Sequence, residues 1–118
     1  MGYANDVVLI LNKDGQDKFK FEVSCISNPE IKEELLKLIY SPSKFMIKDM
    51  TECYIWNNIN WNIKKESISW MMGIIETITS NDVLFIRTGQ EWFDFEVIGE
   101  FYNNPFDISL NITINNIN

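Results

Sequence analysis

The residues best suited to chemistry are carboxylates gathered in the last third of the chain. From residue 76 onward the 118-residue sequence holds seven acids and one base, whereas residues 1–75 hold ten acids and nine bases. Most of the formal net charge of −7 therefore belongs to the last third. The acids there are Glu76, Asp82, Glu91, Asp94, Glu96, Glu100 and Asp107. Carboxylates at this density can hold a metal ion, exchange protons with a substrate or attract a basic partner.

Catalysis has little support in the residue types. The sequence has no histidine, which excludes His-dependent triads, His-ligated zinc and a His general base. A metal-dependent nuclease site could be built on Asp94 and Glu96 with Glu76 or Glu100. However, Ile98 stands where the accompanying lysine is needed. Nucleophile-elbow, dinucleotide-binding and phosphate-loop motifs are absent from the sequence. We therefore expect no enzyme, no cofactor and no metal, with a small carboxylate-dependent enzyme or ligand-binding domain as an alternative.

An acidic stripe beside an aromatic residue suggests binding to a basic protein. In an alternating strand over 92–98, Asp94 and Glu96 would share a face with Trp92. Charge complementarity mainly raises the association rate and selectivity, and an aromatic anchor supplies affinity. The predicted partner-binding residues are Glu91, Trp92, Asp94, Glu96, Glu100 and Asp107. The alternative is a solvated sheet face that keeps the protein soluble.

Arg87 is the only arginine in the sequence. Its guanidinium can pair with Glu76, Asp94 or Glu96 and so tie neighbouring strands together, or it can bind a substrate carboxylate or phosphate. Nucleic-acid binding is not expected, because phosphates need clustered lysines and arginines. The residues assigned structural roles are Arg87, Gly89, Gly99 and Pro105, the last three at predicted turns or bends.

A single α+β domain over residues 1–118 should position these side chains. The pattern predicts an antiparallel sheet of about five to six strands with two helices packed on one face. The expected strands are 6–12, 18–25, 50–56, 82–88, 92–98 and 106–114, and the expected helices are one from Ser27 to Ser41 and one over 66–79. The first two strands would form a hairpin around Asp14-Gly15. Residues 43–63 are the hardest part to interpret.

The remaining cysteine and tryptophan residues are expected mostly in the core. Cys25 continues the apolar face of the predicted strand 18–25, and Trp70 adjoins the apolar stripe of the second helix. Trp56 and Trp61 flank an Asn-rich loop, so that one of them could be exposed. The two cysteines match no redox or zinc spacing, and the sequence has no secretion signal or membrane-length apolar run. We therefore expect a cytoplasmic protein without disulfides and without a membrane association.

The segment from Trp70 to Ile114 resembles small bacterial immunity proteins of polymorphic toxin and contact-dependent growth inhibition systems. The resemblance lies in the run from Ile86 to Glu91, in Asp94, Glu96 and Gly99, and in Asn104-Pro105-Phe106 ahead of an alternating strand. It implies a cytoplasmic protein that binds and neutralises a cognate toxin domain, often a nuclease. The alternative is a phage or mobile-element inhibitor that mimics nucleic acid and blocks a host nuclease.

Overall fold

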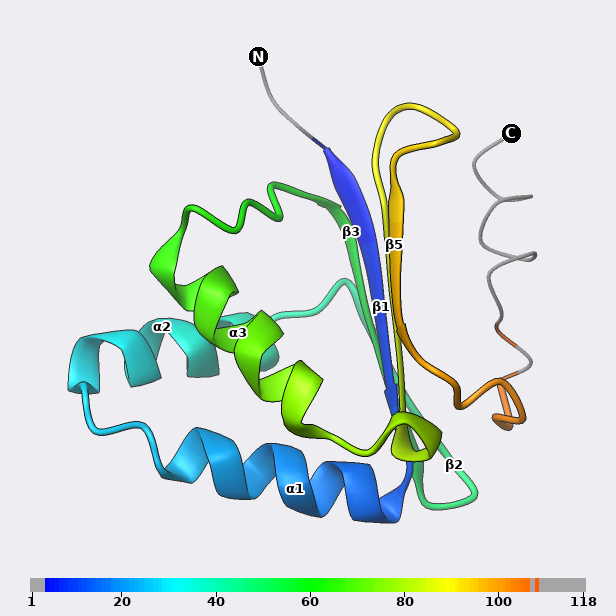
Figure 1. The fold of residues 1–118 in the computed structure, drawn as a ribbon, viewed down its shortest axis with the longest axis horizontal. Helices are drawn as coiled ribbons and strands as arrows, with labels where there is room; N and C mark the ends of the chain where they lie inside the picture. The colour runs from blue at the N-terminus through cyan, green and yellow to red at the C-terminus, as the bar shows by residue number, and fades with distance from the viewer. Residues whose placement is uncertain (1–3, 107, 109–118) are drawn as a thin grey trace.

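The computed structural model describes residues 4–106 and 108. They form one five-stranded antiparallel sheet in the order β2-β3-β1-β4-β5, with helices α1, α2 and α3 on one face (Figure 1). In chain order the elements are β1 (Asn5–Leu11), α1 (Lys13–Ser24), α2 (Pro29–Ile39), β2 (Lys44–Lys48), β3 (Thr51–Ile59), α3 (Glu66–Thr77), the short 3-10 helix η1 (Ser80–Asp82), β4 (Val83–Thr88) and β5 (Phe95–Gly99). The predicted α+β class is confirmed, with three helices in the described residues rather than two.

Residues 7–11 of strand β1 form a continuous apolar run, and both faces of the strand are covered there. Val7, Leu9 and Leu11 belong to the core under the helices, whereas Val8 and Ile10 belong to a smaller core on the opposite face. β1 pairs with β3 on one side and β4 on the other, so it lies at the centre of the sheet. Successive side chains of a strand point to opposite faces, so a strand that is buried on both faces has a continuous run of apolar residues.

The segment after β5 covers part of the face that carries no helices (Figure 1). Phe101, Phe106 and Ile108 pack against the smaller core, which includes Leu84 and Ile86 of β4. Of the strand predicted over 106–114, the structure describes only residues 106 and 108, which are not in a strand. The rest of that prediction lies outside the described residues.

The strand predicted over residues 18–25 is wrong, because these residues belong to helix α1 and its C-cap. Phe19 and Val23 are buried, whereas Phe21 between them is 59% exposed. Residues four apart share a face of a helix, so Phe19 and Val23 satisfy the helical period as well as the strand period. Cys25, predicted to be buried, is exposed just beyond the last turn.

Local signals at its N-terminus explain why α1 forms. The side chain of Asn12 accepts a hydrogen bond from the backbone N–H of Gly15 at 2.8 Å and so caps the helix. The Asp14-Gly15 pair predicted as a hairpin turn is therefore the first turn of α1. Salt bridges four residues apart follow, between Lys13 and Asp17 at 2.9 Å and between Lys18 and Glu22 at 3.5 Å.

The two predicted helices are present with adjusted ends. Helix α2 was expected to begin at Ser27, but its capping residue is Asn28, whose side chain accepts hydrogen bonds from the N–H groups of Glu30 and Ile31. Helix α3 occupies residues 66–77 of the predicted 66–79. Trp70 on α3 is 43% exposed rather than in the core, because the buried face of the helix is formed by its aliphatic neighbours.

Residues 43–63 contain the hairpin of β2 and β3. Asp49 and Met50, with φ of 50° and 60°, form the two-residue turn between these strands, which is the geometry that matches the twist of a tight hairpin. β3 is longer than the predicted strand 50–56. Trp56 and Trp61 are both buried, and their rings continue a row that runs from Tyr54 to Phe85 across the core.

Candidate functional site at the β4–β5 hairpin

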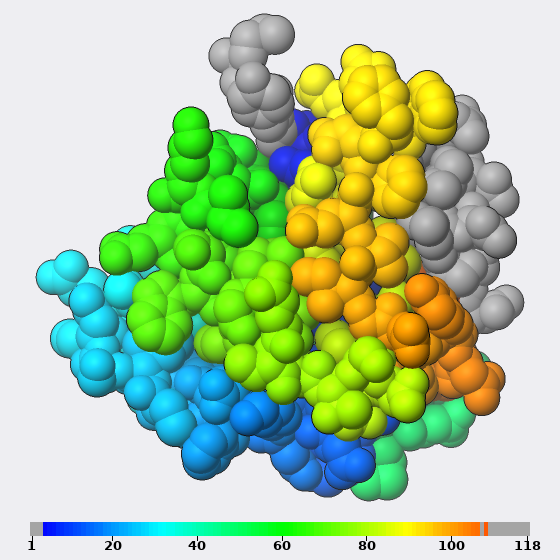
Figure 2. All heavy atoms as spheres, in the orientation of Figure 1, coloured from blue at the N-terminus to red at the C-terminus, as the bar shows by residue number. Residues whose placement is uncertain are grey.

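The turn between β4 and β5 projects at one end of the molecule (yellow in Figures 1 and 2). Strand pairing begins at Thr88 and Phe95, so the predicted strand 92–98 starts three residues too early. Inside the turn, the N–H of Gly89 donates to the carbonyl of Asp94 at 2.6 Å, and the N–H of Asp94 donates to that of Glu91 at 2.9 Å. A Cβ atom on Gly89 would overlap the carboxylate of Asp94, so that side chain would have to move to admit a larger residue.

Two large aromatic side chains are exposed in this turn. Trp92 is 68% exposed and Phe93 is 62% exposed, and their rings meet edge to face with centroids 5.7 Å apart. Glu91 beside them is also exposed. The alternating strand expected over 92–98 places Phe93 on the face opposite Trp92, so its exposure was not predicted. We call Glu91, Trp92, Phe93, Asp94 and Glu96 the hairpin surface.

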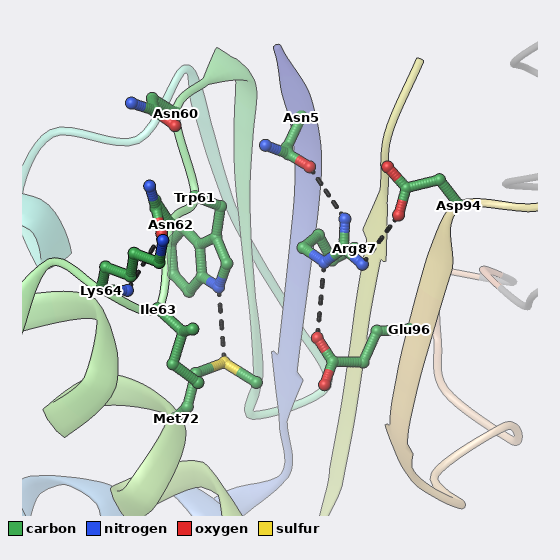
Figure 3. A pocket seen from close by; sticks show the side chains of 10 residues that line it. All are labelled: Asn5, Asn60, Trp61, Asn62, Ile63, Lys64, Met72, Arg87, Asp94 and Glu96. Carbon is green, nitrogen blue, oxygen red and sulfur yellow. Dashed lines mark hydrogen bonds and ion pairs between the residues drawn. The ribbon is translucent and has the colours of Figure 1, made fainter. Parts of the chain in front are cut away.

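Arg87 anchors the two inner carboxylates of the hairpin surface (Figure 3). Its Nη2 lies 3.1 Å from Oδ1 of Asp94 and its Nε lies 3.4 Å from Oε1 of Glu96. Its Nη1 donates to Oδ1 of Asn5 on β1 at 2.9 Å. The guanidinium side chain is only 18% exposed, whereas both carboxylates are almost half exposed. These are two of the three pairings expected for Arg87, and Asn5 is a partner that the sequence did not indicate.

A hollow of about 450 Å³ lies beside Arg87 on the helix side of the sheet (Figure 3). Trp61 and Met72 line its apolar part, and the indole N–H of Trp61 points to the sulfur of Met72 at 3.4 Å. Asn60, Asn62 and Lys64 form the rim opposite Asp94 and Glu96. Arg87, Asp94 and Glu96 therefore line the same side of this hollow.

The remaining predicted site residues lie elsewhere. Glu100 follows the far end of β5, where its N–H donates to the carbonyl of Ser80 at 2.7 Å, so it does not join the hairpin surface. Asp107 lies outside the described residues. Gly99 has φ of 91°, and a Cβ atom there would collide with the carbonyl of Val83.

Asn104 organises the chain beyond β5 and was missed as a structural residue, because Pro105 next to it was chosen instead. The Asn104 side chain is buried and donates to the carbonyls of Phe101 and Ile108 at 3.0 and 2.9 Å. Its oxygen accepts from the N–H groups of Phe106 and Ile108. Pro105 is half-buried inside this loop. The signal in the sequence was an Asn-Pro pair, which is typical of a turn.

Neither a metal-binding group of side chains nor a membrane-spanning helix is found among the described residues. No group of three or more acidic or cysteine side chains within residues 4–106 and 108 is arranged to hold a metal ion. None of the helices in the same residues combines the length and the apolar content needed to cross a membrane.

The fold and the hairpin surface define a small α+β domain with an exposed acidic and aromatic projection. Comparison of the chain with protein-family models, with curated proteins and with solved structures finds no match.

Proposed function

We propose that this protein is an immunity-type inhibitor that binds a basic toxin domain in the cytoplasm through the hairpin surface. The observation that carries the proposal is the exposure of Trp92 and Phe93, at 68% and 62%, next to carboxylates at the tip of a hydrogen-bonded turn. Tryptophan at the centre of an interface commonly supplies a large share of binding energy. Acidic neighbours raise the rate of association with a basic partner.

The hairpin surface is organised before any partner binds. Arg87 fixes Asp94 and Glu96, and it is itself held by Asn5 on the central strand. A surface fixed in this way loses less conformational entropy on binding than a mobile loop would. Occlusion of a toxin's active site or of its substrate path needs this rigidity, because a flexible tip would leave the site open part of the time.

Mimicry of nucleic acid by these acids has less support. A mimic needs carboxylates that are free to replace phosphates, whereas Asp94 and Glu96 share the guanidinium of Arg87. The three charges together amount to −1, and Glu100 lies at the other end of β5. We therefore place the main affinity in the aromatic rings and a steering role in the acids.

The test is capture of the partner followed by rescue of growth. The tagged protein is used to capture proteins from extracts of its source organism, with washes at low and high salt, and a captured basic domain is then expressed alone. We expect that domain to stop growth, and co-expression of the wild-type inhibitor to restore it. The Trp92→Ala, Phe93→Ala double variant should fold and fail to restore growth. Rescue by this double variant, or a captured partner without toxicity, would contradict the proposal.

A further inference from the structure

A second cavity, of about 560 Å³, lies between helices α1 and α2 and the β2–β3 hairpin. Strand β2 is at the edge of the sheet opposite β5, so this cavity is remote from the hairpin surface. Apolar side chains line most of its wall: Phe19, Val23, Leu36, Ile39, Phe45 and Tyr54. Its volume is within the range of about 300–1,000 Å³ usual for small-molecule sites. We call it the α1–α2 groove.

The groove has few charged groups, and they differ in whether an oppositely charged side chain lies near them. Glu52 accepts the hydroxyl of Tyr54 at 2.9 Å and lies 4.0 Å from the ammonium of Lys20, so its charge has two partners. Lys32 of α2 is half-buried, and its ammonium reaches only the carbonyl of Ser24, at 3.5 Å. Among residues 4–106 and 108, no carboxylate pairs with Lys32. The groove therefore has an excess of one positive charge.

Aromatic rings stand exposed at the mouth of the groove. Tyr40 is 80% exposed and Phe45 is 44% exposed, and both line the cavity. Phe45 packs against Tyr54 with ring centroids 4.9 Å apart, so its position is fixed. A ligand that covers these rings removes apolar surface from water, at about 25 cal/mol for each Å² buried.

We propose that the α1–α2 groove binds a small amphiphilic carboxylate, with its hydrocarbon part on the aromatic wall and its carboxylate at Lys32. The wall selects an apolar body, and the unpaired ammonium selects a negative head. A cationic head would face Lys20 and Lys32, and the carboxylate of Glu52 is already engaged by Lys20 and Tyr54. A neutral head would leave Lys32 without a counter-charge. The inference does not depend on the proposed function.

The experiment compares three probes that share one tail. Octanoate, 1-octanol and octylammonium are titrated separately into the labelled protein, and the backbone amide signals are followed by NMR. We expect octanoate to shift amides of α1, α2 and β3 around the groove, saturably, and to bind several times more tightly than the other two. Equal affinity for the three probes would overturn the proposal. Saturable shifts elsewhere only, or no saturation at millimolar concentrations, would overturn it as well.

Variants separate the head from the tail. Lys32→Gln should lower the affinity for octanoate about three- to fivefold and leave the affinity for 1-octanol unchanged, as the loss of one partly exposed charge pair predicts. Lys18→Gln is the matched control, because Lys18 lies on α1 but does not line the groove. Tyr40→Ala should weaken the binding of octanoate and of 1-octanol to the same extent. Unchanged octanoate affinity in Lys32→Gln would show that the charge has no part in binding and would overturn the assignment of the head.

Discussion

The hairpin surface and the α1–α2 groove use aromatic rings in opposite ways. Trp92 and Phe93 project from the hairpin on a convex tip, beside acids. Tyr40 and Phe45 border a concavity, beside lysines. A projecting ring can enter a pocket on another protein, whereas a ring on a concave wall receives something smaller. The difference teaches that exposure of an aromatic residue becomes informative only with the shape and charge around it.

The hairpin surface and the α1–α2 groove also differ in charge. The acids of the hairpin surface come from the last third of the sequence, where one base stands among seven acids. Lys20 and Lys32 come from the balanced first part. Because β5 and β2 are opposite edges of the sheet, the uneven distribution along the sequence becomes an uneven distribution across the molecule. The proposed basic partner and the proposed anionic ligand would thus bind at different edges of the sheet.

The largest effect expected from any variant is on partner binding. Removing both rings with Trp92→Ala and Phe93→Ala should lower the affinity for the captured toxin domain about 100-fold or more, because two anchor residues are lost together. Phe21→Ala is the control, since Phe21 is 59% exposed on α1 and outside the hairpin. Calorimetric titration measures both. A comparable loss in Phe21→Ala would show that exposed rings in general, and not the hairpin, carry the affinity.

The next effect is on folding and compares the two glycines of the β4–β5 hairpin. Gly99→Ala should lower the free energy of unfolding by about 2–3 kcal/mol, because the new methyl meets backbone at a positive φ. Gly89→Ala meets the movable carboxylate of Asp94 and should cost about 1 kcal/mol or less. Urea unfolding compares the two variants with the wild type. Equal losses would show that the carboxylate of Asp94 is as immovable as the backbone.

High pH should affect β3, which forms a wall of the groove, and leave the hairpin unaffected. Burial raises the pKa of the Cys53 thiol from 9.0 to about 11, and burial together with the hydrogen bond to Glu52 raises the pKa of Tyr54. Above pH 9 the unfolded chain loses protons that the folded protein keeps, so stability falls as pH rises towards 11. We expect a loss of roughly 1–2 kcal/mol by pH 10.

Cysteine variants test the origin of this loss. Cys53→Ala should flatten the decline in stability between pH 9 and pH 10, whatever its effect at neutral pH. Cys25→Ala removes the exposed thiol and serves as the control. Unfolding by urea at several pH values gives the slopes. If the slope of Cys53→Ala equals that of the wild type, the buried thiol is not responsible.

The smallest effects concern single charges on the hairpin surface. Glu91→Gln should change the stability by less than about 0.5 kcal/mol, as usual for an exposed site, and slow toxin association about twofold at low salt. Asp94→Asn should slow association similarly and also release one contact of Arg87. Stopped-flow binding at two salt concentrations separates these effects. Rates that do not depend on salt would remove the steering role of the acids.

The sequence was sufficient for the fold class but not for α1. The pattern Phe19, Phe21, Val23 fits strand alternation, and two of these residues also fit a helical turn. What decides between them is local: the Asn12 cap and two salt bridges four residues apart. These signals were present in the sequence, but the cap contributes only about 1 kcal/mol and each ion pair only about 0.2–0.5 kcal/mol, so the apolar pattern was given more weight.

The candidate site was predictable in part. Glu91, Trp92, Asp94 and Glu96 are brought together because they are close in sequence at a turn. The Arg87 pairing with Asp94 and Glu96 follows from the strand register, whereas the contact with Asn5 depends on β1 lying next to β4. The α1–α2 groove was not predicted from the sequence. One part of its wall is helix α1, which was predicted to be a strand, and another part comes from residues 43–63, whose structure the sequence pattern did not indicate clearly.

The central position of β1 in the sheet has a consequence for folding while the protein is being synthesised on the ribosome. Val7 pairs with Trp56 on one side and with Arg87 on the other, so the first strand to be made needs two much later ones. At about 5–20 residues per second, β4 emerges roughly 4–15 s after β1. Until then an apolar strand has an open edge, which is a template for pairing with other chains. Productive folding therefore depends on how long the nascent chain is kept apart from its neighbours.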